Sequence, residues 1–209
     1  MKTLFSILVP ALLLTSSLCA QNSIEILVGP NIANMTIPDN LIQGTVWSSK
    51  YGFAISSSVT FDLLNNLTLS PGVRFIQKGI NAEFPFGPGV IIHASTTNNY
   101  AEIPVYFNYK IYDSPTRVFI QAGPTYSFLL ASNGKTTSDL GDWSSNTRSE
   151  YESHDFSLDF GLRTEMILNS EFSFVSTLSF SRGLINISAS DKYEQTRDFR
   201  LMIGLSRIF

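Results

Sequence analysis

The chain has 209 residues, a formal net charge of −3 and a single cysteine, Cys19. This length suits one domain, and the slightly acidic balance gives no reason to expect nucleic acid as a partner. Because Cys19 lies in a segment that we expect to be cleaved, disulfides, thiol catalysis and cysteine-based metal sites are excluded from the mature chain.

The first predicted element is a secretory signal peptide over residues 1–20. The charge of Lys2 precedes a short apolar run at 4–14, and the small residue Ala20 stands at the expected cleavage point. The apolar run is shorter than the ~20 residues that a spanning helix needs, which disfavours an N-terminal anchor helix. We therefore expect residues 21–209 to form the mature domain.

The mature chain predicts eight strands in which apolar side chains alternate with small or polar ones. Successive side chains of a strand point to opposite faces, so each of these strands has one apolar face. The predicted strands cover residues 23–33, 50–62, 67–79, 99–112, 116–130, 155–168, 171–185 and 196–209.

The predicted connections alternate between short and long. Tight turns rich in turn-forming residues occupy 62–66, 113–115 and 169–170. Longer polar segments lie between them, at 34–49, 80–98, 131–154 and 186–195. This plan is typical of an outer-membrane barrel, with tight periplasmic turns and longer outside loops. The fold class is therefore all-β, a closed eight-stranded antiparallel up-and-down transmembrane β-barrel in which the last strand pairs with the first.

The polar faces decide between this barrel and a soluble lipocalin-like barrel, in which the apolar residues would point inward. They carry glycine, serine, threonine and charges of both signs, which fits a narrow lumen filled by paired side chains. A gate or a proton path is the alternative interpretation of the same charges. The polar network predicted for the lumen comprises Glu25, Arg74, Glu102, Lys110, Asp159, Arg163, Glu165 and Arg200.

Four prolines fall inside predicted strands, where a residue without an N–H weakens a ladder paired on both sides. Pro30, Pro71 and Pro124 each have a glycine neighbour. We expect β-bulges at these three positions. Pro104 has no such neighbour, and the local sequence offers no account of it.

Several segments resemble the PorT-like outer-membrane β-barrel proteins of Bacteroidota. Leu69-Ser-Pro-Gly-Val-Arg-Phe-Ile-Gln-Lys-Gly79 is similar to the third-strand segment of that family, and Tyr100-Ala-Glu-Ile-Pro-Val-Tyr-Phe107 to its fourth strand. Ala122-Gly-Pro124 and the region of Gly161 also stand where the family would have them. The resemblance implies a barrel over the whole mature chain and supplies a reason for the prolines. The named member of the family is associated with a secretion and gliding apparatus, a role that these short structural motifs do not transfer.

The last strand also resembles the signal read by the outer-membrane assembly machinery, which ends in an aromatic residue preceded by alternating apolar ones. The matching residues are Leu201, Ile203, Leu205 and Phe209. Arg207 departs from the pattern, and it is where a misplaced strand register would be sought first. A long arginine near a membrane boundary can also extend its charge to water.

No catalytic constellation, metal site or cofactor site is predicted. The two histidines, His93 and His154, fall in predicted outside loops. Ser153 and Asp155 flank His154, but neighbouring strand residues point to opposite faces and do not form a triad simply. Trp47, Tyr51 and Trp143 lie in or near loops, where they would anchor at the membrane interface or contact a ligand.

The sequence thus favours a non-enzymatic integral outer-membrane barrel with a filled lumen and a surface, structural or envelope-complex accessory role. A small-solute channel or a ligand-binding barrel is the alternative, and a lipid-modifying barrel enzyme ranks third. The expected partners are outer-membrane lipid, the assembly machinery and an envelope protein complex, with no nucleic acid.

Overall fold

The computed structural model describes residues 23–36, 44–86, 90–138, 141–190 and 193–209. The predicted signal peptide therefore lies outside the described residues. The strands are β1 (Ser23–Thr36), β2 (Val46–Leu64), β3 (Leu67–Pro85), β4 (Ile91–Tyr112), β5 (Thr116–Ser138), β6 (Gly141–Asn146), β7 (His154–Ile167), β8 (Phe172–Gly183) and β9 (Gln195–Ile208), with a 3-10 turn η1 (Arg148–Glu150) between β6 and β7. No helix among these residues is long and apolar enough to cross a membrane.

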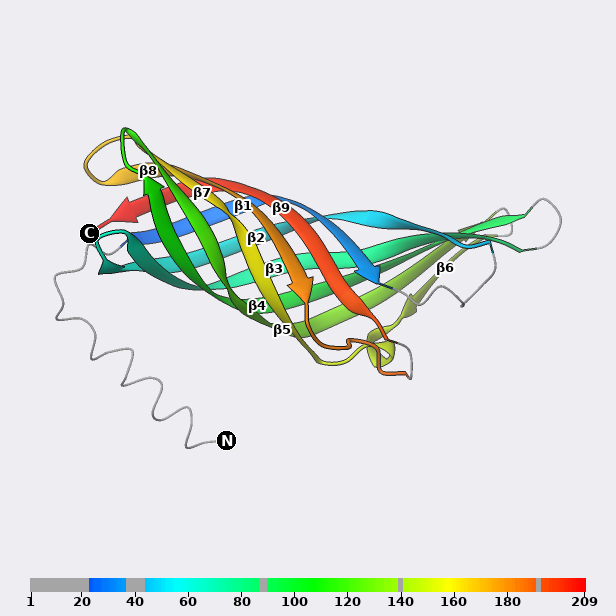
Figure 1. Ribbon diagram of the computed structural model, residues 1–209. Helices are drawn as coiled ribbons and strands as arrows, with labels where there is room; N and C mark the ends of the chain where they lie inside the picture. Colours follow the sequence, from blue (N-terminus) through cyan, green and yellow to red (C-terminus); the bar gives the residue numbers. More distant parts are fainter. Residues whose placement is uncertain (1–22, 37–43, 87–89, 139–140, 191–192) are drawn as a thin grey trace, which may run out of the picture.

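Eight of the strands close into an antiparallel barrel, which confirms the predicted fold class (Figure 1). Strands that are adjacent in the sequence pair around the ring, including β4 with β5. The exception is β6, which stands outside the ring, so β5 pairs with β7. The ring closes where β1 pairs with β9, from Ser23 opposite Ile208 to Thr36 opposite Gln195. We call the end with the short turns the turn end and the opposite end the loop end.

The apolar faces point outward, which contradicts the soluble lipocalin-like alternative. Along β9 the exposed fractions of Phe199, Leu201, Ile203 and Leu205 lie between 45% and 52%, whereas Arg200 between them is fully buried. The other strands repeat this arrangement, with Ile26, Phe53, Ile103, Phe160 and Leu178 among the exposed apolar residues. An apolar outer surface around a polar interior is the arrangement that a lipid environment favours.

Arg207 does not mark a misplaced register. It pairs with Ile24 on one side and with Phe172 on the other, in step with the rest of β9. Its guanidinium carbon lies 5.8 Å from the centroid of the Phe172 ring, and its Nη2 lies 3.6 Å from Oε2 of Glu171. The side chain therefore stands on the outer face at the turn end, where an ion pair neutralises it.

The expectation of β-bulges at the glycine-flanked prolines is wrong. Pro30 pairs with Phe53, Pro71 with Val105, and Pro124 with Leu158, all in continuous register. The register shifts of the described strands lie at other places, among them between Ser49 and Ala54 in β2. Near Pro30 the pairing of β1 with β9 skips two residues and resumes in the same register. The barrel thus accommodates these prolines by omitting a pairing rather than by inserting a residue.

Two of the predicted long loops are largely β-structure, which corrects the predicted connections 80–98 and 131–154. β3 continues to Pro85 and β4 begins at Ile91, so these strands form a long hairpin. β5 continues to Ser138 and folds back as β6. β7, by contrast, begins at His154 opposite Phe128 of β5, so β5 runs on for roughly 30 Å along the strand without β7 beside it.

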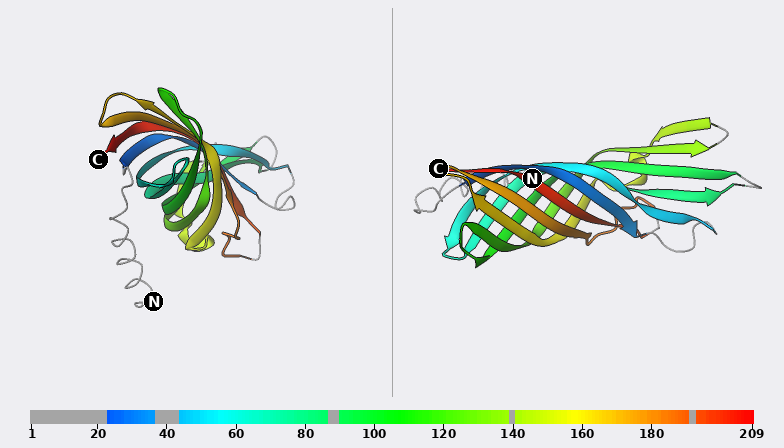
Figure 2. Two further views of the ribbon diagram at one scale, coloured as in Figure 1. Left: turned by 60° about the vertical axis from the view of Figure 1, so that its left-hand side comes forward. Right: turned by 90° about the horizontal axis from the view of Figure 1, so that it is seen from above.

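The extended strands form one sheet beyond the loop end of the barrel, which we call the wall. Its segments are 46–49, 80–85, 91–98, 132–138 and 141–146, in the order β2-β3-β4-β5-β6. Figure 2 shows these strands projecting past the end of β7, β8 and β9. One side of the barrel rim is therefore much taller than the other.

Candidate functional site

A cluster of charged side chains crosses the middle of the lumen. Arg74 of β3, Glu102 of β4, Asp159 of β7 and Arg200 of β9 are each at most 5% exposed. Arg74 donates from Nε to Oε2 of Glu102 at 2.6 Å and from Nη2 to Oδ2 of Asp159 at 3.1 Å. Arg200 donates from Nη2 to the same Asp159 oxygen at 2.7 Å. These contacts cross the lumen and join opposite sides of the barrel.

Lys78 extends this central cluster toward the loop end. Its Nζ lies 2.8 Å from Oε1 of Glu102, 3.3 Å from Oδ2 of Asp198 and 4.0 Å from Oδ2 of Asp155. Asp198 also lies 3.1 Å from Nη1 of Arg200. Three buried cations therefore face four buried carboxylates. Burying these charges is costly unless they are paired, and each of them has an oppositely charged neighbour.

Hydroxyl groups donate further hydrogen bonds to Glu102, Asp155 and Asp159 of the central cluster. Tyr106 donates to Oδ2 of Asp159 at 2.5 Å, and Thr125 donates to the same oxygen at 3.1 Å. Ser127 donates to Oε1 of Glu102 at 3.0 Å, and Thr196 donates to Oδ2 of Asp155 at 2.7 Å. The short residues of the polar faces thus hydrogen-bond the carboxylates as well as leaving room for the long cations.

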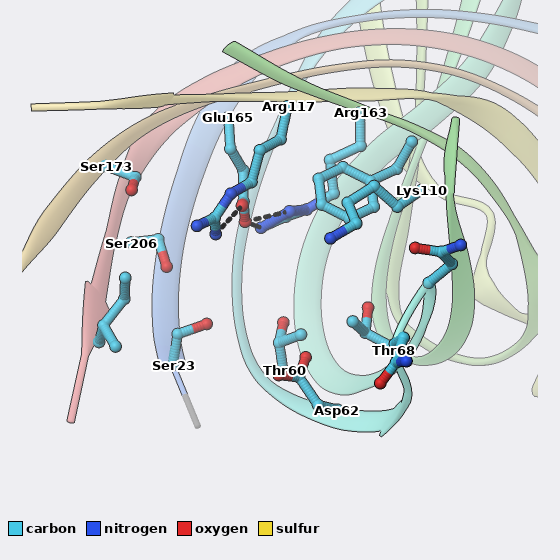
Figure 3. A pocket seen from close by; sticks show the side chains of 14 residues that line it. Ser23, Thr60, Asp62, Thr68, Lys110, Arg117, Arg163, Glu165, Ser173 and Ser206 are labelled. Carbon is cyan, nitrogen blue, oxygen red and sulfur yellow. Dashed lines mark hydrogen bonds and ion pairs between the residues drawn. The ribbon is translucent and has the colours of Figure 1, made fainter. Parts of the chain in front are cut away.

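A second cluster lies at the turn end, around Arg163. Its Nη2 lies 2.7 Å from Oε2 of Glu25 and 2.6 Å from Oε1 of Glu165, and the guanidinium carbon lies 5.5 Å from the centroid of the Phe119 ring. Figure 3 shows Arg163, Glu165 and Arg117 together above a cavity of about 120 Å³ that is lined by hydroxyl-bearing side chains. The pair of Arg163 and Glu25 separates this cavity from the middle of the lumen.

Lys110 joins neither cluster, although the sequence placed it in the same network. Its Nζ lies 2.6 Å from Oδ2 of Asp113, in the short turn after β4. This hydrogen bond holds the pKa of Asp113 below its ordinary value. Asp62, also on the predicted polar face, lies exposed at the same mouth and lines the cavity. These two residues belong to the turn-end opening rather than to the filled interior.

An apolar plug covers the loop end of the lumen. Ile187, between β8 and β9, is fully buried against Met35 and Ile80, and Tyr151 packs against this cluster. Glu152 donates its N–H to the carbonyl of Ile187 at 2.8 Å, so the segment before β7 is tied to the segment after β8. Burial raises the pKa of Tyr151 to about 12, which keeps its hydroxyl protonated.

The sequence singled out seven of the clustered charges but missed Lys78, Asp155 and Asp198. The missed residues have the same strand parity as the predicted ones, since Lys78 follows Arg74 by four residues, and Asp155 and Asp198 precede Asp159 and Arg200 by four and two. All three lie within the predicted strands, so following the alternation over the full length of each strand would have found them. The pairing of Arg163 with Glu25, across the barrel, carries no comparable signal in the sequence.

The histidines do not assemble a catalytic group. His154 points outward beside Tyr126 and Phe128, with its ring centroid 5.7 Å and 5.6 Å from theirs, while its neighbour Asp155 is buried in the lumen. His93 lies on the exposed wall with its Nδ1 3.1 Å from Oε1 of Glu83. Among the residues that the structure describes, no group of three or more His, Cys, Asp or Glu side chains is placed to hold a metal ion.

Comparisons with known proteins agree with this architecture. The family model described as "Outer membrane protein beta-barrel domain" matches residues 19–189. A search among curated protein sequences finds no significant relative.

Several solved structures are similar to this chain, and one of them, with a TM-score above 0.5, supports the fold. A major outer membrane protein from Thermus thermophilus is 16% identical, covers 91% of this chain and 100% of its own, and has a TM-score of 0.55. Neisserial surface protein A is 13% identical, covers 89% of this chain and 97% of its own, and has a TM-score of 0.46. OprG from Pseudomonas aeruginosa is 14% identical, covers 91% of this chain and 96% of its own, and has a TM-score of 0.43. At these identities the likeness concerns the fold.

Proposed function

Because the chain belongs to the outer membrane protein beta-barrel domain family, we propose that it is a non-enzymatic protein whose barrel is a closed anchor in the outer membrane. In this proposal the wall is presented at the cell surface, where it serves a structural or adhesive role or contacts an envelope protein complex. The observation that carries the proposal is the central cluster, in which ion pairs run from β3 and β4 across the lumen to β7 and β9.

Three successive barriers favour an anchor over a small-solute channel. Arg163 and its carboxylates fill the lumen near the turn end. Arg74, Lys78 and Arg200 with their partners fill the middle. Ile187 and its apolar neighbours cover the loop end. A passing ion would have to break paired, buried charges at two of these levels, and each broken pair is costly in a lumen of low dielectric constant.

Single-channel recording tests this proposal directly. We expect the refolded full-length protein, reconstituted in a planar lipid bilayer, to give no conductance steps above the noise of the empty bilayer. A wide porin in the same bilayer provides the positive control, because its open lumen conducts. Reproducible steps from the wild-type protein would contradict the closed lumen and favour the channel.

The outward position of His154 supports the non-enzymatic part of the proposal. A general base must lie within hydrogen-bond reach of its nucleophile and of the group that orients it. The ring of His154 packs against Tyr126 and Phe128 on the outer face, whereas the carboxylate of Asp155 faces Lys78 in the lumen. Asp155 therefore does not orient His154, which counts against His154 as the base of a lipid-modifying enzyme.

We also propose the finer assignments that the sequence suggested. The segments 69–79 and 100–107, on β3 and β4, support membership of the PorT-like group of Bacteroidota barrels. The charge of Lys2, the apolar run at 4–14 and the small residue Ala20 support a cleaved signal peptide and export in a Gram-negative cell. Leu201, Ile203 and Leu205 face outward on β9 and Phe209 is 70% exposed at its end, which supports their assignment as a sorting signal read by the assembly machinery.

A further inference from the structure

The two tryptophans of the chain stand on the same face of the wall. The backbone pairs Trp47 with Ala82, Ala82 with Ala94, Ala94 with Thr136, and Thr136 with Trp143. Directly paired residues of an antiparallel sheet point to the same side. Trp47 and Trp143 therefore lie at the two margins of one row across five strands, roughly 19 Å apart at a strand spacing of about 4.8 Å.

This face of the wall, which we call the inner face, continues the lumen face of the barrel. Ile76, Lys78, Ile80 and Ala82 alternate along β3 and are all buried. The row next to the tryptophans, toward the barrel, consists of Ser49, Ile80, Thr96, Gly134 and Ser145. The row toward the tip contains Phe84, Ile92, Ser138 and Gly141. None of the side chains in these two rows carries a charge.

The opposite face of the same strands is charged. Glu83 pairs with His93, with Oε1 and Nδ1 3.1 Å apart, and Lys135 pairs with Asp142, with Nζ and Oδ2 3.5 Å apart. All four residues are exposed. Both faces of the wall stand beyond the barrel, so contact with water alone gives no reason for one face to exclude charge. The absence of charge on the inner face therefore indicates that it contacts a binding partner rather than water alone.

The floor between the tryptophans is shallow and the rings are accessible. Of the residues between them, Ala94 and Thr136 are partly exposed, and their small side chains leave space above the sheet, whereas Ala82, which pairs with Trp47, is buried. Trp47 is 40% exposed and Trp143 is 54% exposed. A Cβ built on Gly141 would meet Cη2 and Cζ2 of Trp143 at 3.8 Å, so this ring extends along the sheet over the backbone of residue 141. Because β7, β8 and β9 end lower, no barrel strand stands opposite the inner face in the part of the chain that the structure describes (Figure 2).

We propose that the inner face of the wall binds an uncharged glycan chain, with sugar rings stacked on Trp47 and Trp143. The C–H groups on one side of a pyranose ring carry partial positive charge, and the face of an indole is electronegative. Thr136 lies in the same row and Ser145 in the row below, so their hydroxyls are placed to hydrogen-bond sugar hydroxyls. This assignment rests on the proposed function, because it needs the wall to stand outside the cell.

The size and charge of the inner face favour a glycan over other occupants. Three rows of about 7 Å across roughly 19 Å give an area of about 400 Å², part of which is covered because Ile80 and Ala82 are buried, and this is well below the ~800 Å² that each partner of a standard protein complex buries. A second copy of the chain or a folded protein therefore covers too little surface here. An anionic glycan would need cations, and on the described wall the cation Lys135 lies on the outer face.

Tryptophan fluorescence reports on this face alone, because the chain has two tryptophans and both lie on it. The refolded full-length protein, in a detergent without a sugar headgroup, is titrated with maltoheptaose, cellohexaose and chitohexaose up to millimolar concentrations. We expect a saturable shift in emission with at least one of these neutral glycans. Trp47→Ala and Trp143→Ala should each weaken binding about tenfold, and each variant keeps the other tryptophan as its reporter.

The matched controls are Lys135→Ala and Asp142→Ala, which alter β5 and β6 on the outer face and should leave the affinity unchanged. The proposal is overturned if no neutral glycan binds, if the tryptophan variants bind as the wild type does, or if the outer-face variants lose as much affinity. Stronger binding of a sulfated heparin hexasaccharide would contradict the choice of an uncharged ligand. A dimer in sedimentation that Trp143→Ala abolishes would assign the face to a second copy instead. Bilayer conductance tests the closed lumen separately, so failure of either proposal is recognisable without the other.

Discussion

Arg200→Ala is expected to destabilise the folded barrel by roughly 3–5 kcal/mol, because it leaves the four buried carboxylates of the central cluster with only the cations of Arg74 and Lys78. Arg200 is fully buried, and its guanidinium lies 2.7 Å from Asp159 and 3.1 Å from Asp198. Its Nε also donates to Ser179 at 3.2 Å. Lys78 and Arg74 remain, but both already form ion pairs with Glu102, and each also pairs with at least one of the aspartates. The loss should appear as a lower urea midpoint and a lower temperature at which the folded band disappears in heat-modifiability gels.

Arg207→Ala is the matched control on the same strand. Arg207 pairs with Glu171 at 3.6 Å with both side chains 59% exposed, and an exposed pair of this kind contributes at most about 1 kcal/mol. A double variant, Arg200→Ala with Asp159→Asn, separates charge from packing, since it also removes the carboxylate that Arg200 neutralises. We expect it to recover part of the lost stability. A midpoint for Arg200→Ala equal to that of Arg207→Ala would show that the central cluster does not stabilise the barrel.

Gly204→Ala is expected to disrupt closure of the ring and to cost about 3 kcal/mol or more. Gly204 lies on β9 opposite Leu27 of β1, at the seam where the last strand meets the first. A Cβ on this residue would overlap the backbone carbonyl oxygen of Ile26. Gly29 of β1 is pressed in the same way against the carbonyl oxygen of Leu201. Both strands of the seam thus approach too closely for a side chain, and the obstructing atoms are backbone atoms that cannot rotate away.

Gly134→Ala provides the control for this seam variant. A Cβ at position 134, on the wall, would meet Cγ2 of Thr147 at 3.0 Å and Oγ of Ser145 at 3.1 Å, and both are side-chain atoms that can shift. We expect Gly134→Ala to refold with the yield of the wild type, and Gly204→Ala to remain mostly in the unfolded band. Equal refolding yields for the two variants would mean that the seam is looser than its backbone contacts indicate.

The barrel could be predicted from the sequence because lipid and lumen impose opposite demands on alternate residues. On β9, apolar Phe199 and Leu201 flank Arg200, and on β7 Phe160 and Leu162 flank Gly161, so period two is plain wherever one face meets lipid. The predicted ends of the strands near the turns agree with the structure to within two residues for the same reason.

The wall could not be predicted in this way because neither of its faces is continuously apolar. Residues 94–98 read Ala-Ser-Thr-Thr-Asn, and small polar residues of this kind occur on both sides. Without a continuous apolar face, the alternation of apolar and polar residues is lost, and the segment resembles a loop. The cross-lumen partners of Arg74 and Arg163 were also beyond the sequence, since they depend on how far the strands are staggered around the ring.

Labelling of single cysteines on intact cells tests most directly whether the barrel spans the outer membrane and carries its wall outside. Cys19 is the only native cysteine and lies in the predicted signal peptide, so an introduced cysteine would be the single thiol of the mature chain. Ser144→Cys, on β6, and Ser114→Cys, in the turn between β4 and β5, both place the thiol at an exposed position. With a membrane-impermeant maleimide, Ser144→Cys should react on intact cells and Ser114→Cys only after the outer membrane is permeabilised. The opposite pattern, or equal reaction of both variants before permeabilisation, would contradict the account.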